Sequence, residues 1–270
     1  PLPNNGSILP SFDLSEIQVL RGPQGVLFGR NTTGGALLIR TVEPGQEGRG
    51  RVTLGSYRLR EIEAAADLTP EGAPIAARLA IYGLKRGGVV ENLGVGGDLD
   101  DRNQAAARLS LAWRPDGPLS ALLVVDGFRA WETGSAAILS GTYPNPPDVM
   151  GGGNARTPEA SAYFDCGQLG CDIDIALAQQ RARGPRQTDI DLAPRSDRRN
   201  DGATLRLDWR EGGLALRSVT AYRRSVLDSA LDTDGSPLRL NEIVRHIDLG
   251  QFTQELRASR TSTHTTWQTG

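Results

Sequence analysis

From residue 51 onward, apolar and polar residues alternate along much of the chain. An alternation with a period of two is typical of β-strands, because successive side chains point to opposite faces. The clearest stretches are residues 51–54, 61–68, 75–82, 107–113, 120–126, 204–209 and 251–258. Residues 214–222 have the composition of a strand, but their phase is not defined. We therefore expect about eight strands, with a ninth beginning at Trp267.

The connections between these strands also alternate in length. Short, turn-rich connections are expected at residues 69–74, 115–118 and 211–213, and longer polar ones at residues 86–100, 132–199 and 228–248. Short turns on one side and long loops on the other are typical of an outer-membrane β-barrel, with the short turns in the periplasm.

A barrel places the two faces of each strand in different surroundings. We expect one set of residues to face the lumen, namely Arg78, Arg108, Arg206 and Glu255, and another to face lipid, namely Leu79, Ile81, Leu109, Leu111, Leu205 and Leu207. Trp113 and Trp209 lie just before short turns, where an interfacial aromatic girdle would be; a Trp next to a turn is also common in other β-proteins.

Composition narrows the class of protein further. Hydrophobic residues make up 38% of the 270 residues, and no run approaches the ~18 apolar residues that a membrane helix needs. A barrel remains compatible, because only alternate positions of its strands are apolar. The formal net charge of −2 argues against nucleic acid as a partner. The chain begins without Met, and its single Met is Met150, so we expect an internal fragment with its targeting signal upstream.

Residues 14–41 carry the most specific pattern. Two apolar runs, residues 17–20 and 36–39, flank a segment with five glycines, and Pro23 suits the start of a short helical turn over residues 24–28. A nucleotide-binding glycine loop is disfavoured, because neither Gly-Lys-Ser/Thr nor G-x-G-x-x-G between a strand and a helix is present.

Three blocks of this segment resemble the end of the plug domain of TonB-dependent outer-membrane receptors. They are Arg-Gly-Pro-Gln-Gly from Arg21, Leu-Phe-Gly-Arg-Asn from Leu27 and Thr-Gly-Gly-Ala from Thr33, in the same order and spacing. Val26 and Leu38 depart from the family, in which Thr and Asn are more usual, and they leave the ligand open.

The resemblance implies an all-β membrane protein. Residues 1–44 would form the C-terminal part of the plug domain, and residues 45–270 the N-terminal part of an antiparallel transmembrane β-barrel. Plugged transporters have about 22 strands, so the chain would supply about two fifths of the barrel and would not close by itself.

The resemblance also implies a function. It is active uptake across the bacterial outer membrane, driven through TonB of the inner membrane by a contact segment that lies upstream. An iron–siderophore complex is the commonest ligand class of the family, with cobalamin, other metal chelates and saccharides as alternatives. A passive porin or structural barrel and a soluble β-rich binding domain are the competing hypotheses. We expect no enzyme activity and no cofactor.

Arg21 is the residue to which the resemblance gives a role. It implies that the Arg of this block pairs with glutamates on the inner barrel wall, beyond residue 270, and holds the plug in place; an Arg exposed to solvent at a turn is the alternative. The plug motif and plug–barrel contact would comprise Arg21, Gly22, Pro23, Gly25, Phe28, Gly29, Asn31, Gly34 and Gly35.

Residues 132–199 form the longest stretch without alternation, and loops of this length are normally functional or disordered. The layout places this loop outside the cell, and a helix-like run covers residues 173–183. Outside the inner membrane thiols oxidise, so a Cys166–Cys171 disulfide is favoured over a metal pair, which lacks further ligands. His246 and His264 are expected in a loop and near a turn, exposed to solvent and without a metal. Candidate ligand contacts are Tyr143, Tyr163, Phe164, Arg181 and Arg183; a mobile loop with no ligand role is the alternative.

Overall fold

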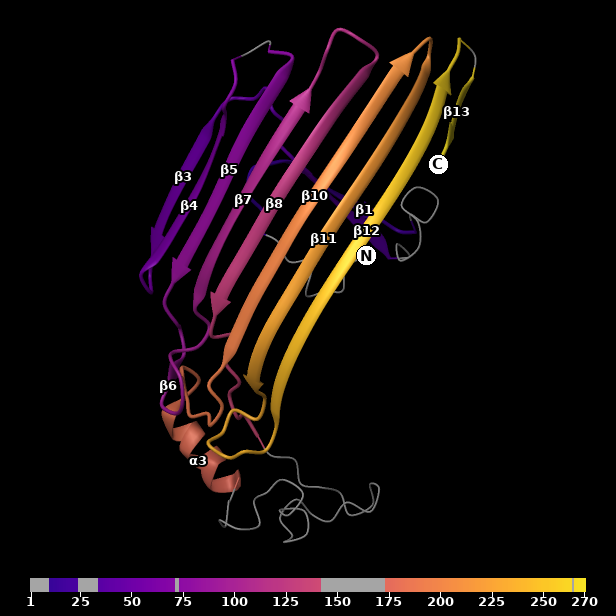
Figure 1. Cartoon of the computed structure of the whole chain (residues 1–270). Coiled ribbons are helices and arrows are strands. Elements are labelled where there is room, and N and C mark those ends of the chain that lie inside the picture. The colour runs from indigo at the N-terminus through magenta and orange to yellow at the C-terminus, as the bar shows by residue number, and fades with distance from the viewer. Residues whose placement is uncertain (1–9, 24–33, 71–72, 142–172, 264) are drawn as a thin grey trace, which may run out of the picture.

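A computed structural model of the chain describes residues 10–23, 34–70, 73–141, 173–263 and 265–270. A nine-stranded antiparallel sheet dominates this described part, and neighbours in the sheet are neighbours in the chain. Figure 1 shows its strands tilted and side by side. Eight strands and the start of a further one confirm the expected number. The strands are β3 (Arg49–Gly55), β4 (Leu59–Asp67), β5 (Ile75–Arg86), β7 (Arg102–Trp113), β8 (Leu119–Glu132), β10 (Arg195–Glu211), β11 (Leu214–Asp232), β12 (Glu242–Thr261) and β13 (Thr266–Thr269).

The connections lie at two distinct ends of the sheet. The β4–β5, β7–β8, β10–β11 and β12–β13 connections are short and lie together at what we call the turn end (Figure 1). The β5–β7, β8–β10 and β11–β12 connections lie at the opposite, loop end, together with the tight β3–β4 hairpin. The loop end also carries β6 (Glu91–Asn92), α3 (Ile173–Arg183) and β9 (Gln187–Thr188). The expected separation of short turns from long loops is confirmed.

The two faces of the sheet differ as alternation predicted. Strand pairing places Leu79, Leu109 and Val125 in one cross-strand row, and all three are exposed. Their neighbours Arg78 and Arg108 point to the opposite face and are buried against the N-terminal segment. We call the first face outward and the second inward. The predicted division of leucine, isoleucine, arginine and glutamate side chains between two faces is confirmed.

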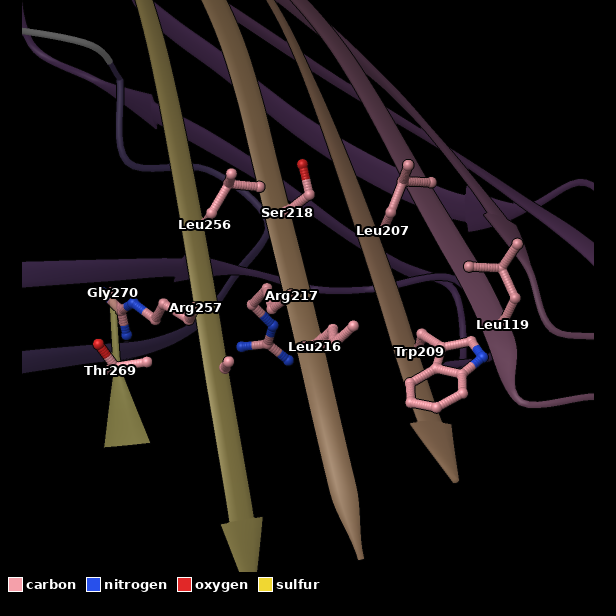
Figure 2. A pocket seen from close by; sticks show the side chains of 11 residues that line it. Leu119, Leu207, Trp209, Leu216, Arg217, Ser218, Leu256, Arg257, Thr269 and Gly270 are labelled. Carbon is pink, nitrogen blue, oxygen red and sulfur yellow. The ribbon is translucent and has the colours of Figure 1, made fainter. Parts of the chain in front are cut away.

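The outward face is apolar at the turn end. Figure 2 shows Leu207 and Trp209 of β10, Leu216 of β11 and Leu256 of β12 around a hollow of about 460 Å³. Trp113 is exposed on the same face at the end of β7. Both predicted girdle residues therefore lie on the outward face near the short turns, which is where a membrane interface would require them.

Strands β10, β11 and β12 are longer toward the loop end than alternation predicted. β10 begins at Arg195, inside the stretch expected to be a loop, and only residues 233–241 connect β11 to β12. His246 consequently lies within β12, where its Nδ1 is 2.6 Å from Asp228 Oδ1, and the expectation that it lies in a loop was wrong. The start of β10, residues 195–201, is polar on both faces, and near the loop end of β11 and β12 apolar residues such as Leu227 and Val244 occur on either face. The period-two signal therefore disappears although the backbone ladder continues.

The N-terminal segment forms a separate two-stranded sheet. β1 (Leu14–Arg21) pairs antiparallel with β2 (Gly35–Thr41), which confirms the two predicted apolar runs as strands. Gly35 has a φ of 139°, and a Cβ atom there would lie 2.3 Å from the Leu20 carbonyl oxygen, so this position requires glycine. Figure 1 shows the hairpin behind strands β10 to β12. Among the described residues, no helix is long and apolar enough to cross a membrane.

Candidate functional site

Asp13, the residue before β1, carries the most extensive contact between the N-terminal segment and the large sheet. Its side chain accepts two hydrogen bonds from Arg78 of β5, from Nε at 2.9 Å and from Nη2 at 2.8 Å. Both residues are only 1% exposed. This is the bidentate geometry in which a guanidinium matches a carboxylate best, and a charge this deeply buried requires such a partner.

The remaining donors of Arg78 are also satisfied. Its Nη1 lies 3.0 Å from Asp67 Oδ1 and donates to the carbonyl oxygens of Gln46 and Glu47 at 3.2 and 3.3 Å. Arg78 thus binds the chain on both sides of the β1–β2 hairpin, at Asp13 before it and at residues 46–47 after it. Asp67 in turn accepts backbone hydrogen bonds from Gly45 and Gln46, which fixes the connector against β4.

Glu63 of β4 holds the backbone at the same place. Its Oε1 accepts a 2.9 Å hydrogen bond from the backbone N–H of Asp13, and its Oε2 lies 2.7 Å from Arg51 Nη2. Asp13 has a φ of 50°, a region that non-glycine residues rarely adopt, so the backbone bond stabilises an unusual conformation. Arg49, 3.1 Å from Asp13 Oδ1, adds a second cation at the rim.

Phe12 fills an apolar hollow beside this ion pair. Its ring is buried, with its centroid 5.8 Å from that of Tyr82, and the Arg108 guanidinium lies 4.5 Å above it. Arg108 Nη1 also donates to the Phe12 carbonyl oxygen at 3.2 Å. Small inward side chains make room for the ring, namely Ala65, Ala80, Ala106 and Ala130. We call Phe12, Asp13, Glu63, Asp67, Arg78 and Arg108 the junction.

The connector after β2 reaches further across the inward face. Glu43 lies 2.9 Å from Arg206 of β10 and 3.4 Å from Arg114, and Arg114 also donates to the Pro44 carbonyl oxygen at 3.1 Å. The segment is therefore held at the junction by β4, β5 and β7 and again, through Glu43, by β10. These contacts hold the N-terminal segment against the inward face of the sheet, and this is a mechanical role.

The sequence indicated the residues that the large sheet contributes to this junction but missed the residue that the N-terminal segment contributes. Arg78 and Arg108 were predicted on the inward face, and the structure shows what they bind there. Nothing in the pattern singled out Asp13, which is a lone acidic residue between Phe12 and Leu14. Arg108 and Arg78, cations inside otherwise apolar strands, were the signal that a buried partner exists.

The predicted contact at Arg21 stays a prediction. Arg21 lies at the end of β1 opposite Gly35, with an exposed side chain. Gly22 has a φ of 81°, which agrees with a glycine-specific turn at the end of β1. Pro23 and Gly34 border the described part, whereas Gly25, Phe28, Gly29, Asn31 and the expected helical turn lie outside it.

The predicted ligand loop is partly described. The helix expected over residues 173–183 is confirmed by α3. Arg183 pairs with Asp189 at 3.1 Å, whereas Arg181 is exposed. The other residues predicted to act in this loop lie outside the described residues, namely Tyr143, Tyr163, Phe164, Cys166 and Cys171; so does His264.

The end of this loop is built into the loop end of the sheet. β9 pairs parallel with β6 of the β5–β7 loop, and Gln187 donates to Glu91 at 2.8 Å. Ile190 packs with Val90 and Leu99 in a small apolar cluster. Across the described ranges, no group of three or more His, Cys, Asp or Glu residues could hold a metal ion.

No protein-family model matches the chain. Solved structures do resemble it. The ferric yersiniabactin uptake receptor FyuA from Yersinia pestis aligns with a TM-score of 0.67 and 16% identity, over 94% of this chain and 34% of FyuA. The siderophore receptor PiuA from Acinetobacter baumannii aligns with a TM-score of 0.67 and 14% identity, over 94% of this chain and 33% of PiuA. The ferric-catecholate import receptor Fiu from E. coli, in its open form, aligns with a TM-score of 0.62 and 15% identity, over 93% of this chain and 37% of Fiu.

These alignments establish the fold. The chain is mostly antiparallel β-sheet with one short helix, and its large sheet has the architecture of part of an antiparallel β-barrel, as the sequence predicted. It spans about a third of the length of each receptor that it matches. At this level of identity the likeness concerns architecture, and the ligands named for the three receptors are properties of those proteins.

Proposed function

We propose that this chain is part of an outer-membrane receptor that takes up an iron–siderophore complex with energy delivered through TonB. The single observation that carries the proposal is the junction. A hairpin tied to the inward face of a barrel sheet by a buried ion pair obstructs the lumen, so passage of a ligand requires the obstruction to rearrange. Residues 1–44 would be the end of the plug, and residues 45–270 the first part of the barrel.

The orientation follows from the two ends of the sheet. The turn end would face the periplasm and the loop end the outside, as in other outer-membrane barrels. The outward face, apolar near the turn end, would contact lipid. A soluble binding domain is disfavoured, because large side chains of the outward face, such as Leu79, Val125 and Phe252, are exposed and no described segment covers them.

The test uses the full-length receptor that contains this chain. It is expressed in a bacterial strain that lacks its own siderophore receptors, and uptake of radiolabelled ferric siderophores is measured with and without TonB. We expect uptake of at least one siderophore class, lost when TonB is deleted and unaffected by a porin deletion. TonB-independent passage would favour a passive porin, and TonB-dependent uptake of cobalamin or a saccharide alone would correct the ligand.

The β8–β10 loop should contribute to ligand capture, because it lies at the proposed outer opening. Deleting residues 151–187 removes α3 with Arg181 and Arg183, and we expect weaker binding of ferric siderophore to whole cells, since Arg and aromatic side chains dominate binding hot spots. Shortening the opposite-end β7–β8 turn is the matched control. Unchanged affinity and uptake after the loop deletion would leave the loop without a role in capture.

A further inference from the structure

The outward face changes character along β4, β5 and β7. In one cross-strand row Ile62 pairs with Gly83, and Gly83 with Ala105. This row is apolar, and two of its three residues have no side chain or only a methyl group. In the next outward row toward the loop end, Arg60 pairs with Lys85. The outward face thus changes from apolar side chains to cations between two consecutive rows, as at the border between acyl chains and headgroups.

Basic side chains surround a hollow of about 640 Å³ at this border. We define the basic hollow by Arg58 of the β3–β4 hairpin and by the outward cations Arg60 and Lys85. Among the described residues, Arg58, Arg60 and Lys85 have no carboxylate within 4.0 Å, although all three are exposed. The other outward cations near the loop end differ, because Arg224 pairs with Asp248 at 2.6 Å and Arg129 with Asp201 at 2.8 Å.

The other groups that line the hollow do not neutralise these three cations. Arg86 and Arg102 lie opposite one another at inward positions of β5 and β7, and Arg102 pairs with Glu132 at 3.6 Å. Asp101 is engaged, since its Oδ1 accepts hydrogen bonds from the backbone N–H and the hydroxyl of Thr133 at 2.7 and 2.8 Å. Asp98, which also lines the hollow, is exposed to solvent. Arg86 donates to the Asp100 carbonyl oxygen through Nη2, while its buried Nε has no partner within the described part of the chain.

The hairpin that carries Arg58 is held in an unusual conformation. Tyr57 and Arg58 both have positive φ, 57° and 60°, a turn geometry that normally selects Asn-Gly. The turn is kept in place by a 2.8 Å hydrogen bond from the Gly87 N–H to the Tyr57 carbonyl oxygen and by Arg186, 3.1 Å from the Tyr57 hydroxyl. Such strain persists where the surroundings fix it, and it commonly marks a functional position.

We propose that the basic hollow binds the phosphate headgroup of an anionic lipid in the outer leaflet, with an acyl chain lying over Gly83 and Ala105. The inference rests on the proposed outer-membrane location. Guanidinium and ammonium groups are the usual phosphate ligands, and clustered cations beside an apolar membrane surface select phosphorylated headgroups. A neutral ligand would leave three unpaired cations beside lipid, and a free phosphate would not use the apolar row below them.

The experiment measures lipid retention by the purified full-length receptor. The protein is reconstituted with bis-phosphorylated lipid A or with its dephosphorylated form, and bound lipid is quantified by native mass spectrometry. The test variant is R58Q/R60Q/K85Q, and the matched control is R224Q, which alters an outward cation that already has a partner. We expect the test variant to retain about tenfold less phosphorylated lipid A, because it has lost three cations that attract the headgroup. R224Q should behave like the wild type, and the dephosphorylated lipid should bind all three proteins equally weakly.

Two results would overturn the proposal. One is equal retention of phosphorylated lipid A by the wild type and the test variant. The other is complete displacement of the lipid by millimolar inorganic phosphate, which would identify a free-anion site. Retention is measured without transport, so its failure is distinguishable from failure of the proposed uptake: a receptor that binds the lipid and imports no ligand contradicts only the uptake function.

Discussion

Replacing Asp13 with Ala should destabilise the full-length receptor by about 3 kcal/mol, at the lower end of the cost of breaking a buried ion pair. The substitution leaves the Arg78 guanidinium buried without its bidentate partner. Asp67, 3.0 Å away, still offsets part of the charge, which is why the lower end applies. The quantity to measure is the free energy of unfolding by urea in detergent, followed by tryptophan fluorescence.

The control is the exposed ion pair of Arg224 and Asp248, for which D248A should cost far less than D13A, because water screens the two charges. The double variant D13A/R78L should be more stable than D13A alone, because removing both charges removes the uncompensated one. Proteolysis of the N-terminal segment should accelerate in D13A and slow again in the double variant. Equal unfolding free energies for D13A and D248A would show that the junction does not hold the segment.

The junction also bears on how the β1–β2 hairpin could move under the proposed uptake function. The hairpin is tied at both of its ends, by Asp13 before β1 and by the connector residues Gly45 and Gln46 after β2. A rearrangement that clears the lumen then has two routes. Either the buried ion pair breaks, or the junction stays fixed and the movement is confined to other parts of the plug. The size of the D13A effect on uptake, compared with its effect on stability, separates the two.

The predictability of the fold from sequence follows from what each segment faces. Where strands have one apolar and one polar face, as around Leu79 and Leu109, the alternation predicted both the strand and the face to which each side chain points. Where both faces are polar, as in residues 195–201 at the start of β10, the alternation was absent and the extension of the strand was not predicted. The hydrogen-bonded ladder of a sheet forms with or without alternation in the sequence. Alternation arises only where the two faces of a strand meet different surroundings.

The candidate site was predictable on one side only. Arg78 and Arg108 could be placed on the inward face, because a cation in an apolar strand must find a partner. Asp13 could not be found, since its distance from Arg78 in the chain is large and its local sequence is ordinary. The glycine motif was informative about Gly22 and Gly35, whose φ values exclude most other residues, because backbone geometry is a local property.

A lysine in place of Leu109 should cost about 2–4 kcal/mol of folding free energy in a bilayer, provided that Leu109 lies near the midplane. Leu109 faces outward, is 37% exposed, and has Leu79 and Val125 as its cross-strand neighbours, so the ammonium would have no polar partner in lipid. The measurement is a urea titration of the full-length receptor folded into phospholipid vesicles.

The matched control for Leu109 places the same charge on the same strand and the same face. Asn103 lies six residues nearer the loop end of β7, at the proposed headgroup border and opposite Lys85. N103K is therefore made in a K85Q background, which removes the like charge, and should cost only about 0–1 kcal/mol relative to K85Q alone. The difference between L109K and N103K isolates depth in the membrane, because strand, face and introduced charge are constant. If both lysines cost the same, the outward face does not border lipid, and a soluble or differently covered sheet would have to replace the barrel.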